Sequence, residues 1–112
     1  MSSSNVVRVE RDGELVVVVV HNPPVNTNDA GVRAGLQQAL SQIQSSKDVR
    51  GVLLLCAGST FFSGADIGEF SGPPREEEYR HLFNGYEALS VPVVAAMHGT
   101  VMGGGLGIAL AC

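Results

Sequence analysis

The segment from Val93 to Cys112 constrains the fold of this chain more than any other. Val93–Met97 has the length and the β-branched residues of a buried strand, and His98–Met102 follows as a loop. Gly103–Gly105 then opens a run of small and apolar residues that is compatible with a helix. Three glycines in a row cost conformational entropy, but they leave bare N–H groups at the start of a helix, where the dipole is positive. The segment is therefore suited to stabilising a developing negative charge.

The first half of the chain alternates between strand-like and helix-like patterns. Val6–Arg11 and Leu15–Val20 predict a half-exposed strand and a more buried strand, joined by a hairpin turn at Asp12-Gly13. Asn28 or Asp29 is expected to cap an amphipathic helix. The apolar positions of that helix are Val32, Leu36, Ala39, Leu40 and Ile43.

The second half adds another strand and another helix before the glycine-rich segment. Gly51–Cys56 predicts a buried strand, and Arg75–Leu89 predicts a mostly exposed helix. The side chains of that helix expected to point inward are Leu82, Phe83 and Tyr86. Strands separated by helices predict an α/β sheet with right-handed crossovers, behind an antiparallel hairpin. The strands expected to be buried on both faces are Leu15–Val20, Val52–Cys56 and Val93–Met97.

Composition and charge exclude several classes of protein. Hydrophobic residues make up 45% of the sequence and the net charge is −4, which indicates a buried globular core and gives no reason to expect a nucleic-acid partner. No apolar run reaches the roughly 18–20 residues that span a bilayer, and the N-terminus lacks a secretory signal pattern. We therefore expect no membrane span, and a location in the bacterial cytoplasm or an organellar matrix rather than secretion.

The cysteines and the end of the chain allow two further expectations. Cys56 and Cys112 both lie in apolar runs, which favours two reduced, buried thiols over a disulfide. The sequence stops at Cys112 within an apolar helical run, without a C-cap or a polar tail. This ending predicts that the 112 residues are a fragment of a longer protein.

Two loops follow two of the predicted buried strands. Ala57–Asp66 comes after one strand and His98–Gly105 after the other. In open α/β sheets, binding sites lie outside the carboxyl ends of the strands, so the loops share one crevice if the strands are neighbours. Each loop offers small residues beside backbone donors, and two donors that converge on one oxygen form an oxyanion hole. Ordinary tight turns are the alternative interpretation.

Other binding motifs fit the sequence less well. Gly58–Ala65 lacks the lysine of a phosphate-binding loop, and no nucleophile elbow is present. A dinucleotide-binding fingerprint has Ile108 where its third glycine belongs. The histidines show no metal-ligand spacing with each other or with the cysteines, so we expect no metal site. They are His21, His81 and His98.

Three motifs together resemble the enoyl-CoA hydratase/isomerase (crotonase) superfamily. They are NPPVN at Asn22–Asn26, SGADI at Ser63–Ile67 and GGGLGIALAC at Gly103–Cys112. Their order and spacing match along essentially the whole chain, most like the N-terminal hydratase/isomerase part of a multifunctional fatty-acid β-oxidation enzyme. The resemblance implies a crotonase-like spiral of ββα units, of which residues 1–112 form a partial domain, the first half, truncated at its C-terminus.

The resemblance also implies roles for individual residues. The backbone N–H groups of Ala65 and Gly104 would form an oxyanion hole for the carbonyl of an acyl-CoA thioester and stabilise its enolate. The implied substrate-binding residues are Ser63, Ala65, Asp66, Ile67 and Gly104. Coenzyme A is part of the substrate, so no separate cofactor is implied. The full-length protein can be a monomer or an oligomer under this resemblance.

Gly107 departs from the family pattern. Hydratases of this family carry a glutamate at this position, two residues after the glycine run, which acts on the attacking water. Their second catalytic glutamate falls beyond Cys112. Taken with the resemblance, the sequence predicts an enoyl-CoA hydratase/isomerase, that is, a lyase or isomerase. Its expected setting is fatty-acid β-oxidation or related acyl-CoA metabolism. We do not expect residues 1–112 alone to be active. A catalytically impaired acyl-CoA-binding fragment is the alternative, and a nicotinamide dinucleotide-binding enzyme is disfavoured by Ile108.

Overall fold

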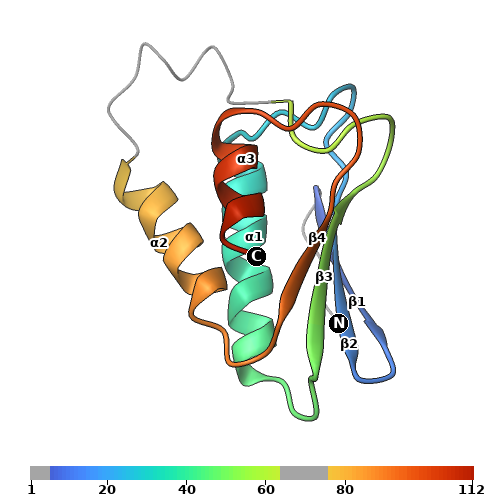
Figure 1. The fold of residues 1–112 in the computed structure, drawn as a ribbon, viewed down its shortest axis with the longest axis vertical. Coiled ribbons are helices and arrows are strands. Elements are labelled where there is room, and N and C mark those ends of the chain that lie inside the picture. Colours follow the sequence, from blue (N-terminus) through green and yellow to red (C-terminus); the bar gives the residue numbers. More distant parts are fainter. Residues whose placement is uncertain (1–5, 64–75) are drawn as a thin grey trace.

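Residues 6–63 and 76–112 are described in a computed structural model of the chain (Figure 1). The strands are β1 (Val7–Asp12), β2 (Leu15–Val20), β3 (Gly51–Cys56) and β4 (Val93–Ala96), and the helices are α1 (Ala30–Ser45), α2 (Glu76–Glu87) and α3 (Gly103–Leu110). The predicted strands and the helix before the last strand are confirmed, with bounds that agree to within two residues.

The four strands form one sheet in the order β1-β2-β3-β4. β1 and β2 pair antiparallel around a tight turn, in which Gly13 has a φ of 61°. β2, β3 and β4 run parallel, with α1 between the first two and α2 between the last two. This topology confirms the predicted hairpin followed by strands that alternate with helices.

Helix α1 forms as its apolar spacing predicts. Its cap is Asp29, whose carboxylate accepts a hydrogen bond from the Val32 N–H at 2.9 Å. The side chain of Asn28, the other predicted cap, is buried instead. The five predicted apolar positions of α1 are all buried and pack with the inner residues of the sheet into one core.

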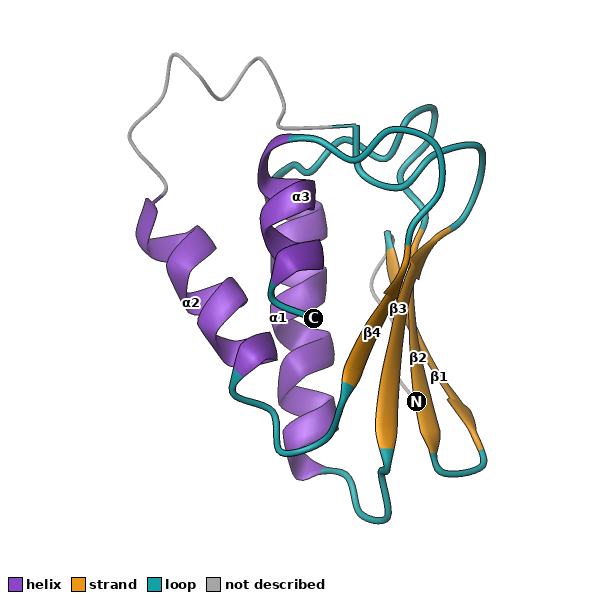
Figure 2. Cartoon of the chain, viewed as in Figure 1, coloured by secondary structure: helices purple, strands orange, loops and turns teal. Residues whose placement is uncertain are grey.

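The helices lie together on one side of the sheet (Figure 2). The pairing register places Val17, Leu53 and Val94 in one row on the opposite side. Val17 and Leu53 are half-buried and Val94 is 59% exposed, because nothing in the described ranges covers β4 on that side. Within the described residues β4 therefore lacks part of the cover on both faces that its apolar run predicts, and it is also one of the two edge strands of the sheet.

This open surface leads to a prediction for the isolated chain. We expect residues 1–112 alone not to form a stable, active monomer, because the apolar row and the free β4 edge favour association between molecules. Light scattering and a thermal unfolding curve test this expectation. A cooperative transition of a monodisperse monomer that also binds acyl-CoA at micromolar concentration would contradict it.

The expectations for the two cysteines and for a membrane span can also be compared with the structure. Cys56 and Cys112 are both free thiols, and Cys56 is buried, which raises the pKa of its thiol to about 12. Cys112 is exposed in this chain, so its predicted burial is wrong. Among the helices of the described residues, none combines the length and the apolar character that crossing a membrane requires.

Candidate active site

The loops that follow β3 and β4 are joined by backbone hydrogen bonds. The Phe61 N–H donates to the His98 carbonyl at 2.7 Å, and the Met102 N–H donates to the Phe62 carbonyl at 3.2 Å. Because β3 and β4 are parallel neighbours, the two loops leave the sheet at the same end, the carboxyl ends of these strands. The expectation that both loops lie together depends on this adjacency, which is confirmed.

Side chains add to this connection between the loops. The Thr60 hydroxyl donates to the Thr100 carbonyl at 2.9 Å and accepts from the Thr100 N–H at 2.7 Å. The Nε2 atom of His98 lies 2.8 Å from the Gly58 carbonyl oxygen, and a carbonyl can only accept, so Nε2 carries the proton there. These contacts give His98 a structural role in the loop, in agreement with its prediction as a loop residue.

Asn26 connects the loops at the carboxyl ends of the strands, a role that the residue pattern did not predict. Its side chain is 3% exposed, and its amide nitrogen donates to the carbonyls of Ala57 at 2.7 Å and Thr60 at 2.8 Å. Its amide oxygen accepts from the Asn22 N–H at 2.8 Å. The NPPVN motif thus connects the loop after β2 with the loop after β3. The sequence indicated this connecting role only by placing an asparagine directly after two prolines and a valine.

Gly99 allows the two loops to approach closely. Its φ is 64°, and a Cβ atom built on it would lie 2.8 Å from the Ser59 carbonyl oxygen and 2.9 Å from the Thr60 Cα. Both atoms belong to the backbone, so the conflict could not be relieved by rotating a side chain. The contact between the loops therefore requires glycine at this position.

We expect Gly99→Ala to destabilise the complete protein more than Gly13→Ala does. The two glycines have nearly equal φ values, 64° and 61°, but no atom lies within 4 Å of a Cβ placed on Gly13. Gly13→Ala should therefore cost only the backbone strain, about 1–2 kcal/mol, whereas Gly99→Ala adds the displacement of the Ser59–Thr60 backbone. Urea unfolding of both variants measures the difference. Equal losses of stability would show that the loops do not need this close approach.

Helix α3 begins directly after the joined loops. Its N-cap is Met102, whose side chain makes no capping hydrogen bond, and the helix starts at Gly103 with a φ of 56°. The Leu106 N–H makes a helical bond to the Met102 carbonyl at 3.3 Å. Gly104 thus occupies the first turn, where the N–H groups of any α-helix have no partner within the helix. This position is the predicted place for a donor to a negatively charged oxygen.

The other predicted site residues are only partly described. Ser63 is half-buried and directly follows Phe62, which is bonded to Met102. Ala65, Asp66 and Ile67 lie outside the described residues. The site is therefore built from the glycine start of α3 and from the β3 loop as far as Ser63.

Gly107 faces helix α2. A Cβ atom built on Gly107 would lie 2.7 Å from Cζ and 2.8 Å from Cε2 of the Phe83 ring. The ring of Phe83 is half-buried, and its centroid is 5.8 Å from that of Tyr79, also on α2. Phe83 thus occupies the space that a side chain at position 107 would use, a relationship that the sequence could not reveal because the residues lie on different helices.

Two hollows in the described part of the chain lie away from the joined loops. A hollow of about 300 Å³ is lined partly by Ile43 and Leu89, and another of about 350 Å³ partly by Tyr86 and Pro92. Both lie beside the start of β4, whereas the joined loops lie beyond its end. In the described parts of the chain, no three His, Cys, Asp or Glu residues come together as metal ligands would.

Comparison with known proteins supports the sequence resemblance. The family Enoyl-CoA hydratase/isomerase matches residues 10–112. A protein of Bacillus subtilis (strain 168) named probable enoyl-CoA hydratase is 31% identical over 115 residues, which cover 96% of this chain and 45% of that protein. The fatty acid oxidation complex subunit alpha of Shewanella sp. (strain ANA-3) is 34% identical over 116 residues, which cover 96% of this chain and 16% of that subunit.

Solved structures of the same kind share the fold. A crystal structure of an enoyl-CoA hydratase from Mycobacterium avium subsp. paratuberculosis K-10 is 30% identical and matches with a TM-score of 0.87. The match covers 100% of this chain and 46% of that one. The predicted α/β, crotonase-like fold is thereby confirmed, and the chain spans less than half the length of these relatives.

Proposed function

Because this chain belongs to the enoyl-CoA hydratase/isomerase family, we propose that the complete protein acts on an acyl-CoA thioester and stabilises its enolate. The family is one of enzymes, and relatives of this chain are named as enoyl-CoA hydratases and fatty acid oxidation complex subunits. The proposed setting is therefore fatty-acid β-oxidation or related acyl-CoA metabolism.

The main support for this function is the contact between the β3 loop and the start of α3. The hydrogen bond from the Met102 N–H to the Phe62 carbonyl brings the two segments together. Ala65 follows Phe62 by three positions and Gly104 follows Met102 by two, so both proposed donors lie close in sequence to this contact. Backbone N–H groups from two separate segments can then converge on one oxygen, as an oxyanion hole requires.

The chemistry of the proposed site follows from these donors. Removing a proton beside a thioester carbonyl, or adding a nucleophile to its conjugated double bond, places negative charge on the carbonyl oxygen. Donors that are already held in place stabilise this charge without reorganising during the reaction. The hydrogen bonds of Thr60, Asn26 and His98 join the described parts of the two loops, which supports such an arrangement. The positive end of the α3 dipole acts in the same direction.

Gly107 favours a second candidate function. A glycine cannot act on a water molecule, so this position supplies no general acid or base. A protein with the oxyanion hole alone could bind acyl-CoA and be catalytically impaired. It could also catalyse an isomerisation, which needs no attacking water.

Binding and turnover by the complete protein separate these functions. We expect micromolar binding of a 2-enoyl-CoA by calorimetry, and a change in the absorbance of its conjugated thioester if hydration takes place. Interconversion of 3-enoyl-CoA and 2-enoyl-CoA without hydration would identify an isomerase, and binding without either reaction would identify the impaired protein. Binding of NAD but not of acyl-CoA would overturn the proposal.

A further inference from the structure

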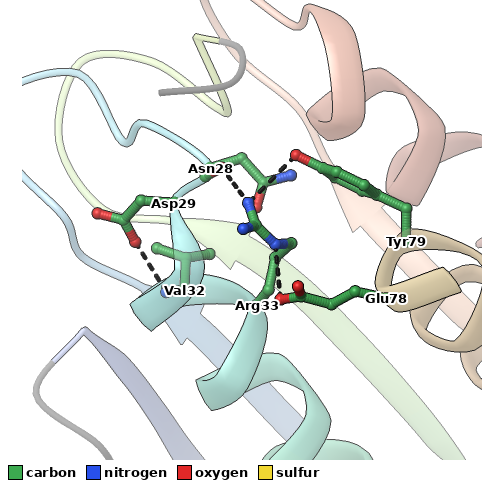
Figure 3. A network of polar contacts seen from close by, with 6 residues as sticks. All are labelled: Asn28, Asp29, Val32, Arg33, Glu78 and Tyr79. Atoms are coloured by element: carbon green, nitrogen blue, oxygen red, sulfur yellow. Dashed lines mark hydrogen bonds and ion pairs between the residues drawn. The ribbon is translucent and has the colours of Figure 1, made fainter. Parts of the chain in front are cut away.

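Arg33 is buried on helix α1, although the sequence pattern did not place it among the inward positions. Its side chain is 1% exposed and lies between α1 and the first turns of α2 (Figure 3). The Nε atom forms an ion pair with the Glu78 carboxylate at 2.8 Å. The Nη1 atom donates to the Asn28 carbonyl at 2.8 Å and to the Tyr79 hydroxyl at 3.2 Å. The guanidinium carbon also lies 4.9 Å from the centre of the Tyr79 ring.

This arrangement requires arginine for geometric reasons. A buried cation loses the hydration that it has in water, and only well-placed partners offset this loss. The guanidinium can donate in several fixed directions and stack on a ring, so it contacts a carboxylate, a carbonyl and an aromatic residue together. An ammonium group is a compact charge and cannot reproduce all three contacts. Glu78 keeps 39% of its side chain exposed, so the ion pair lies at the border of the core.

The contacts of Arg33 fix the first part of α2, while other contacts fix its last part. Near the end of α2, the Tyr86 hydroxyl donates to the Leu36 carbonyl at 2.8 Å, and Gly85 lies against the Leu40 side chain. Near its start, Glu78 and Tyr79 contact Arg33 of α1. Without Arg33, the first turns of α2 would therefore lose these polar contacts with α1.

The start of α2 is also connected to α3 through aromatic residues. The ring of Tyr79 is next to that of Phe83, and Phe83 packs against Gly107 on α3. Because protein interiors are densely packed, a shift of the first turns of α2 moves the surface against which α3 rests. Gly104 lies one turn before Gly107 on that helix.

We propose that Arg33 is a positioning residue for the thioester site. It holds the first turns of α2, and α2 in turn sets the place of the glycine start of α3 through Tyr79 and Phe83. This role rests on the proposed function. A displacement of about 1 Å at a reacting group can cost roughly 10²-fold in rate, so a small shift of α3 has a measurable effect.

The test compares Arg33→Met with Ile43→Ala in the complete protein. Both residues are buried on α1, but Ile43 lies near the opposite end of that helix from Arg33. We expect Arg33→Met to lower kcat by roughly 10-fold to 10²-fold with a smaller change in KM, because transition-state contacts are lost. Ile43→Ala, at a similar loss of stability by urea unfolding, should leave kcat nearly unchanged. Arg33→Lys should recover part of the loss.

Hydrogen exchange of the peptide that contains α3 gives a readout independent of activity. Arg33→Met should speed exchange there more than Ile43→Ala does at matched global stability. If Arg33→Met does not fold, Glu78→Gln and Tyr79→Phe make milder changes to the same network and should show the same two effects. Unchanged kcat and unchanged α3 exchange in these variants would overturn the positioning role. If the wild-type protein shows no acyl-CoA turnover but Arg33→Met still speeds α3 exchange, the proposed function is overturned and the connection between the helices stands.

Discussion

Gly107→Glu combined with Phe83→Ala is expected to raise hydration of a 2-enoyl-CoA by roughly 10²–10⁴-fold over Phe83→Ala alone, in the complete protein. The carboxylate would restore the group that hydratases of this family use to act on water. Phe83→Ala is needed because a Cβ at position 107 would lie 2.7 Å from the Phe83 ring. Gly107→Glu alone should gain less, since the ring must first move. A steady-state absorbance assay on the three variants measures these rates.

Gly107→Gln with Phe83→Ala provides the matched control for this experiment. Glutamine has the size of glutamate but no basic carboxylate, so it should fill the space without the gain in rate. A glutamate variant that binds acyl-CoA as well as Phe83→Ala does, yet shows no faster hydration, would contradict the expectation. The site would then be suited to isomerisation or to another enolate reaction.

Ala65→Pro is expected to lower turnover of the complete protein by at least about 10²-fold, the usual effect of removing one oxyanion-hole donor. Proline has no N–H, and its ring also restricts the local backbone. Ala65→Gly keeps the N–H and serves as the control, with a much smaller expected loss. Turnover assays accompanied by circular dichroism separate loss of the donor from loss of the fold. Unchanged turnover in a folded Ala65→Pro protein would show that this N–H does not contact the thioester oxygen.

Local patterns were sufficient to predict most of the backbone. Leu15–Val20 is found at its predicted bounds, because an unbroken β-branched run lies between a glycine turn and two prolines. The helical spacing of Val32, Leu36 and Ile43 likewise predicted which side of α1 is buried. The apolar run of β4 likewise predicted that cover is needed on both faces, but it could not show which face the described residues leave open.

The contacts that shape the site could not be predicted in the same way. The polar contacts of Arg33 with Glu78 and Tyr79 join residues more than 40 positions apart, and a polar residue in an amphipathic helix normally faces solvent. The close approach of Gly107 to Phe83 likewise depends on how α2 and α3 pack. The family resemblance indicated that Gly107 is unusual, but only the structure shows that an aromatic ring fills the space beside it.

Polarisation of the thioester carbonyl is the property that the proposed oxyanion hole must produce. Isotope-edited infrared difference spectroscopy of a 2-enoyl-CoA with a labelled thioester carbonyl, bound to the complete protein, measures it directly. Two converging N–H donors draw electron density onto the oxygen and weaken the C=O bond, so we expect a stretching frequency below that of the same compound in water. Ala65→Pro should return the frequency toward the value in water. A frequency in the wild-type complex equal to or above the value in water would show that no oxyanion hole acts on the thioester.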